Sequence, residues 1–332
     1  MIGQPQSQGA FVVARGSVAD IAAGALAGAV VAIGNFDGVH RGHRAVIGAA
    51  QARARALGRP AAALTFEPHP RSFFRPDQPV FRLSDERAKL RLLAGTELDG
   101  ALVMRFDAAL SHLSAEQFIA RVLLERFRIA GAAIGFDFHF GHQRGGSPAF
   151  LEAAGARHGF AVDVVPPLQD EGRPVSSGVI RAALAEGRVV EACELIGAPW
   201  FVSGTVVHGD KRGRALGFPT ANIRLDPACG LKHGIYAVRV GIGEARHDGV
   251  ASFGRRPMFD NGAPLLEVFL FDYAGDLYGR EIDVAFIGWL RGEERFDGIE
   301  ALKRQMDEDS AQARAVLARA PDAFPRLGRV PA

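Results

Sequence analysis

The chain has 332 residues, 48% of them hydrophobic and 23% charged, which excludes extended disorder and allows two domains with separate cores. The 39 basic and 37 acidic side chains give a net charge of only +2, so we expect no nucleic-acid partner. The longest uncharged apolar run, residues 21–33, is too short to span a bilayer. Because Cys193 and Cys229 are isolated and favour a reducing compartment, we expect a cytoplasmic protein with no membrane partner.

The first half of the chain alternates short apolar runs with helical patterns. The runs predict strands at residues 30–33, 61–66, 101–106, 132–134 and 161–165. The spacing of apolar residues predicts helices at residues 44–57, 83–93 and 115–127. Strands that alternate with helices indicate a parallel sheet covered on both faces, so we expect a Rossmann-like α/β domain at residues 11–185.

The pattern changes after residue 188. A short helix is predicted at residues 189–196, where Gly197 and Pro199 end it. Strands separated by Gly-rich turns follow at residues 200–207, 235–240, 249–253, 265–271 and 281–287, and a last helix at residues 298–318. We therefore expect a linker at residues 186–199 and an antiparallel β-barrel with a C-terminal helix at residues 200–325.

One segment between a predicted strand and a predicted helix, residues 34–43, has the sequence GNFDGVHRGH. Ligands of open α/β sheets bind at the carboxyl ends of strands, where helix N-termini offer N–H groups to phosphate. His40 and His43 are three residues apart, so at a helix start they share a face and can donate to the same phosphate oxygens. The segment predicts a nucleotide-phosphate site, with a metal-binding pair or two surface histidines as the alternatives.

A second segment, residues 204–223, is GTVVHGDKRGRALGFPTANI and lacks the string of a P-loop. Its glycines and basic residues still predict a flexible loop suited to polyphosphate, with a solvated basic hairpin as the alternative. Thr220 and Asn222 are two residues apart, so on a strand they share one face and can share one Mg²⁺.

These segments resemble the bacterial bifunctional riboflavin kinase/FAD synthetase family, whose first domain is a nucleotidyltransferase with an H-x-G-H signature. Three further segments of that domain match in order: TFEPHP at residues 65–70, GFDFHFG at 135–141 and VSSGVIR at 175–181. In the second half, GFPTAN at residues 217–222 matches the riboflavin kinase signature, and LLEVFLFD at 265–272 and DLYG at 276–279 follow as in the family. The resemblance covers residues 11–315.

The resemblance implies that the protein uses ATP and Mg²⁺ to convert riboflavin into FMN and then FMN into FAD, releasing pyrophosphate. In the first domain it implies one ATP site formed by His40, His43, Arg181, Gly34, Phe36, Asp37, Ser176 and Ser177, the serines at a helix N-cap. Asp37 has three interpretations, since it can place Mg²⁺, orient a histidine or form a turn. The resemblance places Asp137 and His69 near the flavin. No general base is required, because the FMN phosphate is already an anionic nucleophile.

In the second domain the resemblance implies ATP contacts from Gly209, Lys211, Gly217, Thr220 and Asn222, with the last two also holding Mg²⁺. Riboflavin must lose a hydroxyl proton, and the family's proposed base corresponds to Glu267. A lone carboxylate on a strand otherwise faces solvent or pairs with a neighbouring strand. The implied partners are riboflavin, FMN, ATP and apoproteins that accept the flavin.

Three positions depart from the family pattern: many relatives carry threonine in place of Gly178, relatives usually carry threonine in place of Met258, and they often carry histidine in place of Phe269. Met258 motivates one competing hypothesis, a nucleotidyltransferase whose barrel has lost kinase activity. Two further hypotheses are an oligonucleotide-binding module and a flavin-storage protein without turnover.

Overall fold

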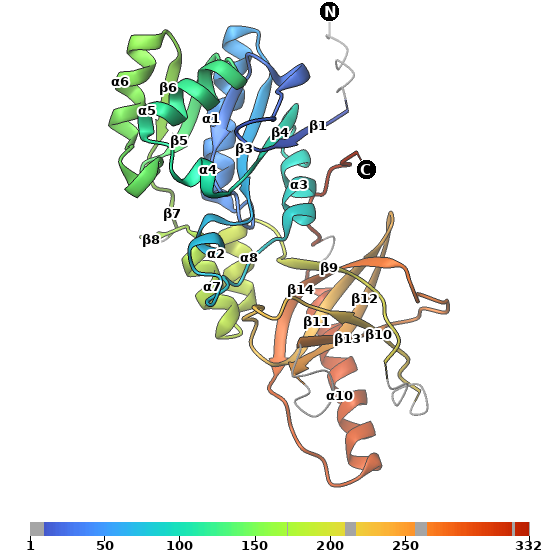
Figure 1. The fold of residues 1–332 in the computed structure, drawn as a ribbon. Helices are drawn as coiled ribbons and strands as arrows, with labels where there is room; N and C mark the ends of the chain where they lie inside the picture. The colour runs from blue at the N-terminus through green and yellow to red at the C-terminus, as the bar shows by residue number, and fades with distance from the viewer. Residues whose placement is uncertain (1–9, 171, 210–216, 256–263, 321–322, 332) are drawn as a thin grey trace, which may run out of the picture. The chain divides into compact units, whose positions relative to one another are not determined.

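The computed structural model describes residues 10–170, 172–209, 217–255, 264–320 and 323–331, which form two compact units (Figure 1). The first unit contains the described parts of Met1–Val80, Asp85–Val175 and Arg326–Ala332, and the second contains Phe81–Ser84 and the described part of Ser176–Pro325. Residues 176–199 belong to the second unit because their two helices pack on each other and on a barrel strand. The domain limits that the sequence indicates, 11–185 and 200–325, stay a prediction.

The first unit is built on a sheet of six strands within the described residues, all parallel, in the order β1-β4-β3-β2-β5-β6. The strands are β1 (Val12–Gly16), β2 (Val30–Ile33), β3 (Ala61–Glu67), β4 (Gly100–Arg105), β5 (Gly131–Gly135) and β6 (Ala161–Val165). The predicted α/β fold is confirmed. Only β1 is not among the predicted strands, because at the sheet edge its residues are half-buried or exposed and give no continuous apolar run.

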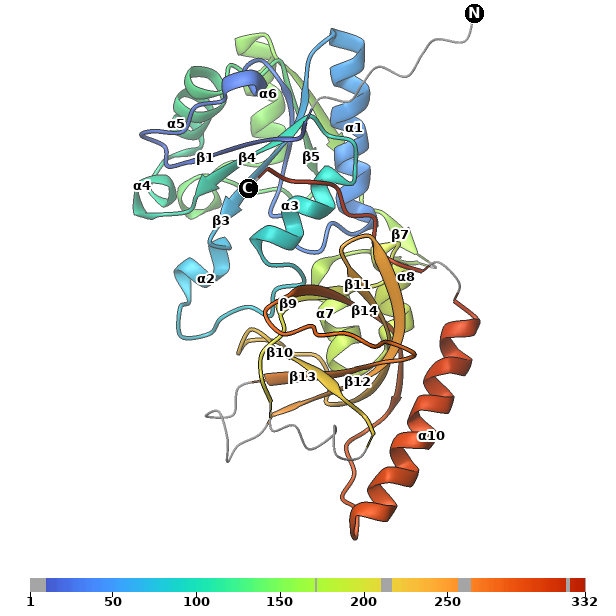
Figure 2. The ribbon, with the colours of Figure 1, turned by 90° about the vertical axis from the view of Figure 1, so that its right-hand side faces the viewer.

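Helices cover both faces of this sheet (Figure 2). On one face lie α1 (Arg41–Leu57) and α3 (Glu86–Ala94). On the other face η1 (Gly24–Leu26), α4 (Ala108–Ser111), α5 (Ala115–Gln117), the π-helix η2 (Phe118–Arg126) and α6 (Pro148–His158) bury a large apolar cluster. The predicted helix at 83–93 begins later, at Glu86, because the Asp85 side chain caps it by accepting the Ala88 N–H at 2.7 Å.

The strand order predicts where a ligand binds. From β2 the chain moves outward to β3 and β4, then returns to β5 on the other side of β2. At such a switch point the connections leave neighbouring strands in opposite directions, which opens a crevice at the carboxyl edge. The segments after β2, β3 and β5 all begin at this edge. The segment after β3 begins the short helix α2 (Pro70–Phe74). The other described elements of the unit are η3 (His142–Arg144) and the hairpin of β7 (Gln169–Asp170) and β8 (Arg173–Pro174).

The second unit contains an antiparallel sheet in the order β10-β13-β12-β11-β14-β9. The strands are β9 (Phe201–Thr205), β10 (Thr220–Arg224), β11 (Gly234–Ile242), β12 (Ala245–Arg255), β13 (Pro264–Leu270) and β14 (Glu281–Arg291). A bridge in which the Val207 N–H donates to the Asn222 carbonyl at 2.8 Å brings the two edges together. The sheet is therefore a nearly closed barrel, as predicted.

Three helices are present among the described residues of the second unit. The C-terminal α10 (Ile299–Ala318) packs on β11, β12 and β14, and Arg291 holds the Asp309 carboxylate through two hydrogen bonds of 2.7 Å. The predicted short helix is α8 (Val189–Ile196), which ends at Gly197 in the left-handed conformation that glycine favours (φ 81°). The third, α7 (Ser177–Ala185), begins where the resemblance implies a helix N-cap, although the sequence pattern gives no range for this helix. None of the described helices is both long and apolar enough to cross a membrane.

Candidate active sites

The loop after β2 places two histidines at the start of α1. Phe36 and Val39 adopt left-handed backbone conformations (φ 50° and 40°) while their side chains are buried, so the loop turns sharply from strand to helix. His40 caps the helix, because its Nδ1 accepts the His43 N–H at 3.3 Å. The two imidazoles stack with ring centroids 3.6 Å apart. The predicted shared face of His40 and His43 is therefore present.

The hydrogen bond to Nδ1 also fixes the chemistry of His40. Since Nδ1 is an acceptor, the proton of the neutral ring is on Nε2, which is then a donor. His40 is only 5% exposed, and the first N–H groups of α1 lie beside it. Imidazole donors and a helix N-terminus at one point suit an anion such as phosphate.

Two glycines of the segment at residues 34–43 pack closely against the His40 and Phe36 rings. A Cβ atom on Gly42 would lie 3.2 Å from the His40 ring and 3.2 Å from the Val175 carbonyl oxygen. A Cβ atom on Gly34 would lie 3.3 Å from the Phe36 ring. A side chain at Gly34 or Gly42 would therefore crowd the neighbouring rings, in addition to hindering any approach to a ligand.

The other predicted residues of the first unit lie on the same carboxyl edge. Asp37 is buried in the loop after β2. His69 follows β3 and caps α2, its Nδ1 accepting the Arg71 N–H at 3.2 Å. Asp137 follows β5 and is exposed. The strand order thus brings histidine and carboxylate side chains from three neighbouring strands to one edge, as the sequence predicts for a nucleotide site.

The remaining residues predicted for this site belong to the second unit. Ser176 caps α7, because its Oγ accepts the Val179 N–H at 3.3 Å, and Ser177 begins the helix. The Arg181 Nε donates to the Phe81 carbonyl at 2.6 Å. A Cβ atom on Gly178 would lie 3.7 Å from the Ser176 Oγ, so packing leaves room for the threonine usual in relatives. Their contacts with ATP stay a prediction.

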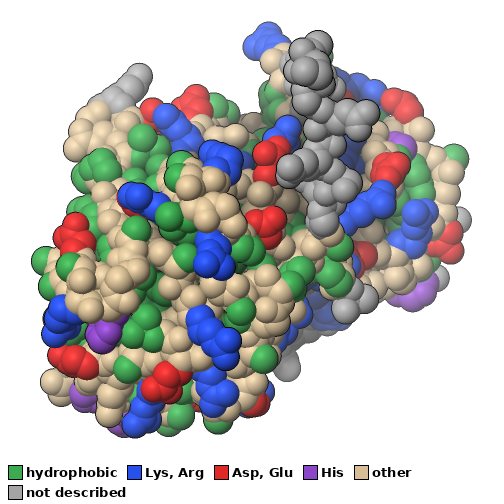
Figure 3. Space-filling model, turned by 90° about the horizontal axis from the view of Figure 1, so that it is seen from above, with side chains coloured by type: hydrophobic (Ala, Val, Ile, Leu, Met, Phe, Trp, Pro, Cys, Tyr) green, Lys and Arg blue, Asp and Glu red, His purple; other side chains and the backbone are tan. Residues whose placement is uncertain are grey.

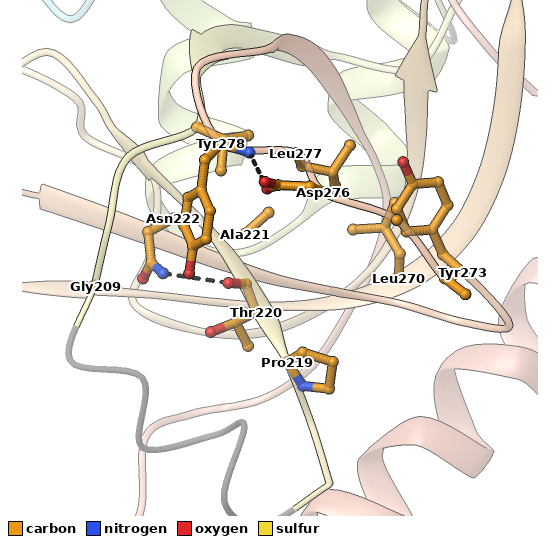
Figure 4. Close-up of a pocket in the computed structure, with 13 residues that line it drawn as sticks. Gly209, Pro219, Thr220, Ala221, Asn222, Leu270, Tyr273, Asp276, Leu277 and Tyr278 are labelled. Atoms are coloured by element: carbon orange, nitrogen blue, oxygen red, sulfur yellow. Dashed lines mark hydrogen bonds between the residues drawn. The ribbon is translucent and has the colours of Figure 1, made fainter.

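The second unit has a cavity of about 440 Å³ beside β10 (Figure 4). Its lining includes Gly209, Thr220 and Asn222, together with the segment from Tyr273 to Tyr278. Gly217, just before β10, has a left-handed backbone (φ 88°) that suits glycine. Lys211 and Met258 lie outside the residues that the structure describes.

The barrel register places Glu267 next to Asn222. In the antiparallel pair of β10 and β13, Asn222 lies opposite Glu267, and Thr220 lies opposite Phe269. Residues directly opposite each other point to the same face of a sheet. Thr220, Asn222 and Glu267 therefore share one face, whereas Ala221 and Ile223 point into the barrel core. Glu267 is half-buried and is not part of the cavity lining.

Asn222 has the features of a cation ligand. The side chain is 4% exposed, and its Nδ2 donates to the Thr220 carbonyl at 3.3 Å. Its Oδ1 is buried and accepts no hydrogen bond from any described residue. An unsatisfied buried oxygen is unfavourable, and amide oxygens are ligands that Mg²⁺ accepts, so this atom fits a divalent cation. The described residues contain no cluster of three or more His, Cys, Asp or Glu able to hold a metal.

Sequence reasoning missed the aromatic part of the cavity. The Tyr278 ring lies 3.8 Å from the His208 ring, measured between centroids, and the Tyr278 N–H donates to Asp276 Oδ1 at 2.9 Å. Tyr278 lines the cavity and lies in a segment that matches the family, but a motif match does not show which side chains face a cavity. Which side chains face the cavity depends on the register of the barrel strands and on the turn formed by residues 273–278.

Comparison with known proteins identifies the family. The FAD synthetase model matches residues 23–179 and the riboflavin kinase model matches residues 196–317. The bifunctional riboflavin kinase/FMN adenylyltransferase of Escherichia coli strain K12 is 42% identical over 288 residues, which cover 86% of this chain and 92% of that relative. The chain belongs to the bifunctional riboflavin kinase/FMN adenylyltransferase family.

Further relatives are similar over the same extent of the chain. The enzyme of the same name from Pseudomonas fluorescens is 41% identical over 292 residues, which cover 88% of this chain and 94% of the relative. A crystal structure described as a macrolide-efflux protein from Streptococcus pneumoniae has a TM-score of 0.81 and 30% identity, and covers 92% of this chain and 99% of its own. Both domains of the family are therefore present in one chain.

Proposed function

We propose that the chain phosphorylates riboflavin to FMN at the barrel site and adenylylates FMN to FAD at the site of the α/β unit. The observation that carries the proposal is the presence of two chemically different sites, each within the range of one family model. One joins imidazole donors to a helix N-terminus, and the other joins a carboxylate to a buried amide oxygen.

Adenylyl transfer requires stabilisation of negative charge. A phosphate oxygen of FMN attacks the α-phosphorus of ATP, the bond to the β-phosphate oxygen breaks, and pyrophosphate leaves. The imidazoles of His40 and His43 donate to the oxygens that gain charge, together with the first N–H groups of α1 other than that of His43, which donates to His40. Arg181, Ser176 and Ser177 would add donors, and Asp137 and His69 would contact the flavin. No proton has to be removed from the nucleophile.

Phosphorylation of riboflavin requires a base as well. The terminal hydroxyl of the ribityl chain attacks the γ-phosphorus of ATP and gives its proton to Glu267, and ADP leaves. Thr220 and Asn222 would hold Mg²⁺, which when bound neutralises charge on the β- and γ-phosphates. Gly209, Lys211 and Gly217 would surround the phosphates. The products FMN and FAD would then pass to apoproteins that accept flavin.

The structure bears on the three competing hypotheses. The pairing of Glu267 with Asn222 and the unsatisfied Asn222 Oδ1 support an intact barrel site, as opposed to one that has lost its chemistry. Basic and acidic side chains are interspersed on the face that Figure 3 shows, whereas an oligonucleotide-binding surface concentrates basic ones. A storage protein has no need of phosphate donors beside a flavin site.

Incubation with riboflavin, ATP and Mg²⁺, followed by chromatographic separation of the flavins, tests the proposal. We expect FMN to appear first and FAD after it, with one ADP and one pyrophosphate released for each FAD. FAD formed only from supplied FMN would show an inactive barrel. Flavin binding without any consumption of ATP would show a storage protein.

Gly209→Ala tests the barrel site specifically. The added Cβ atom would lie 2.6 Å from the Asn222 Nδ2, so the Asn222 side chain must move. A shift of about 1 Å in a positioning group costs about 100-fold in rate, so we expect such a loss in riboflavin phosphorylation and none in FMN adenylylation. Gly292→Ala is the matched control, since its Cβ atom would meet nothing within 4 Å. A Gly209→Ala enzyme that phosphorylates riboflavin at the wild-type rate would contradict the role given to Asn222.

A further inference from the structure

One lysine of the α/β unit is buried against the end of β3. Lys89, on α3, is 1% exposed, and its Nζ lies 2.6 Å from Oε1 of Glu67, whose side chain is 11% exposed. Lysine is almost never fully buried unless it is paired. A buried ion pair adds little to stability, because desolvation of both charges offsets their attraction. Its presence here calls for another reason.

A second contact links Lys89 to the loop that carries the histidines. The Lys89 Nζ donates to Thr65 Oγ1 at 3.4 Å, and Thr65 Oγ1 lies 3.2 Å from the Asn35 carbonyl oxygen. An ammonium has donors only, so the threonine oxygen accepts from it and directs its own hydrogen to Asn35. The ammonium thereby orients the hydroxyl that holds the backbone just before Phe36.

The loop at this point is strained. Phe36 and Val39 are not glycines, yet both have left-handed backbone conformations (φ 50° and 40°). Such conformations persist only where the surrounding structure holds them. The hydrogen bond from Thr65 acts one residue before the first of them, and His40 follows the second directly.

We infer that Lys89 is a positioning residue of the adenylyl-transfer site, acting through Thr65 on the β2–α1 loop and through Glu67 on the end of β3. One buried charge thus holds two of the segments that meet at the carboxyl edge: the loop with His40 and His43, and the segment that leads to His69. This inference rests on the proposed function of that edge. Lys89 itself takes no part in the chemical step.

Thr65→Val and Thr65→Ser separate positioning from simple packing. Valine has nearly the same shape but no hydroxyl, whereas serine keeps the hydroxyl and loses a methyl group. We expect the kcat for FMN adenylylation to fall about tenfold in Thr65→Val with KM for FMN and ATP little changed, since the loop is displaced by a fraction of an ångström. Thr65→Ser should recover most of the wild-type kcat, and riboflavin phosphorylation by the same preparations should be unchanged.

A double variant, Lys89→Met with Glu67→Gln, removes both charges together and leaves neither buried unpaired. It should fold and show the same loss of kcat as Thr65→Val. Wild-type kcat in Thr65→Val or in the double variant, or an equal loss in Thr65→Val and Thr65→Ser, would overturn the inference. If the wild-type protein forms no FAD from FMN at all, the proposed function fails instead, and the two failures are distinct.

Discussion

Replacing His43 by alanine is expected to lower FAD formation from FMN by about 1000-fold, the upper range for loss of one preorganised donor, and to leave riboflavin phosphorylation unchanged. The His43 ring stacks on His40 and meets Phe36 edge-on at 5.4 Å, so its donor is held at the N-terminus of α1. Alanine keeps the backbone N–H that donates to His40, so the helix cap survives. The loss therefore reports on the imidazole and not on folding of the loop.

Steady-state rates of both half-reactions in one preparation measure this effect. His158→Ala is a suitable control, because His158 is an exposed histidine near the end of α6, which leads to the amino end of β6 at the opposite edge of the sheet. It should have wild-type rates. Equal losses of both activities in His43→Ala, or near-normal FAD formation, would be incompatible with a phosphate site at this loop.

Glu267→Gln is expected to have the reverse effect. Glutamine has the same shape and retains hydrogen bonding but cannot accept the hydroxyl proton of riboflavin. A positioned base contributes about 100- to 10,000-fold, so riboflavin phosphorylation should fall within that range while FMN adenylylation is unaffected. Glu244→Gln, an exposed glutamate at the turn between β11 and β12, is the control. If Glu267→Gln keeps its kinase rate, another group accepts the proton.

The sequence predicts the parts of the fold that depend on local patterns. Buried strands such as β2 and β3 are continuous apolar runs, and α1 ends at Leu57 because Gly58 follows in a left-handed conformation (φ 61°). The edge strand β1 lacks such a run, since its side chains are half-buried or exposed. The resemblance implies a helix N-cap at Ser176 and Ser177, but the interpretation of residues 175–181 rests on their serines and arginine and gives no range for α7.

Residue spacing and the family resemblance predict which residues form the sites, but not how strand pairing brings them together. Two histidines three residues apart share a face on any helix, and residues two apart, such as Thr220 and Asn222, share a face on any strand. The pairing of Asn222 with Glu267 depends on strand register across a long stretch of sequence, which no local pattern fixes. In a sequence, Lys89 is indistinguishable from a solvated helix residue, and only the packing of α3 on the sheet shows that it is buried.

The most direct test of two separate sites supplies riboflavin, ATP and Mg²⁺ to His43→Ala and Glu267→Gln, each alone and as an equimolar mixture. We expect His43→Ala to stop at FMN, Glu267→Gln to leave riboflavin unchanged, and the mixture to form FAD after a lag, because FMN released by one variant is adenylylated by the other. A mixture that forms no FAD, or either single variant that forms FAD from riboflavin as the wild type does, would contradict the division of the two reactions between the units.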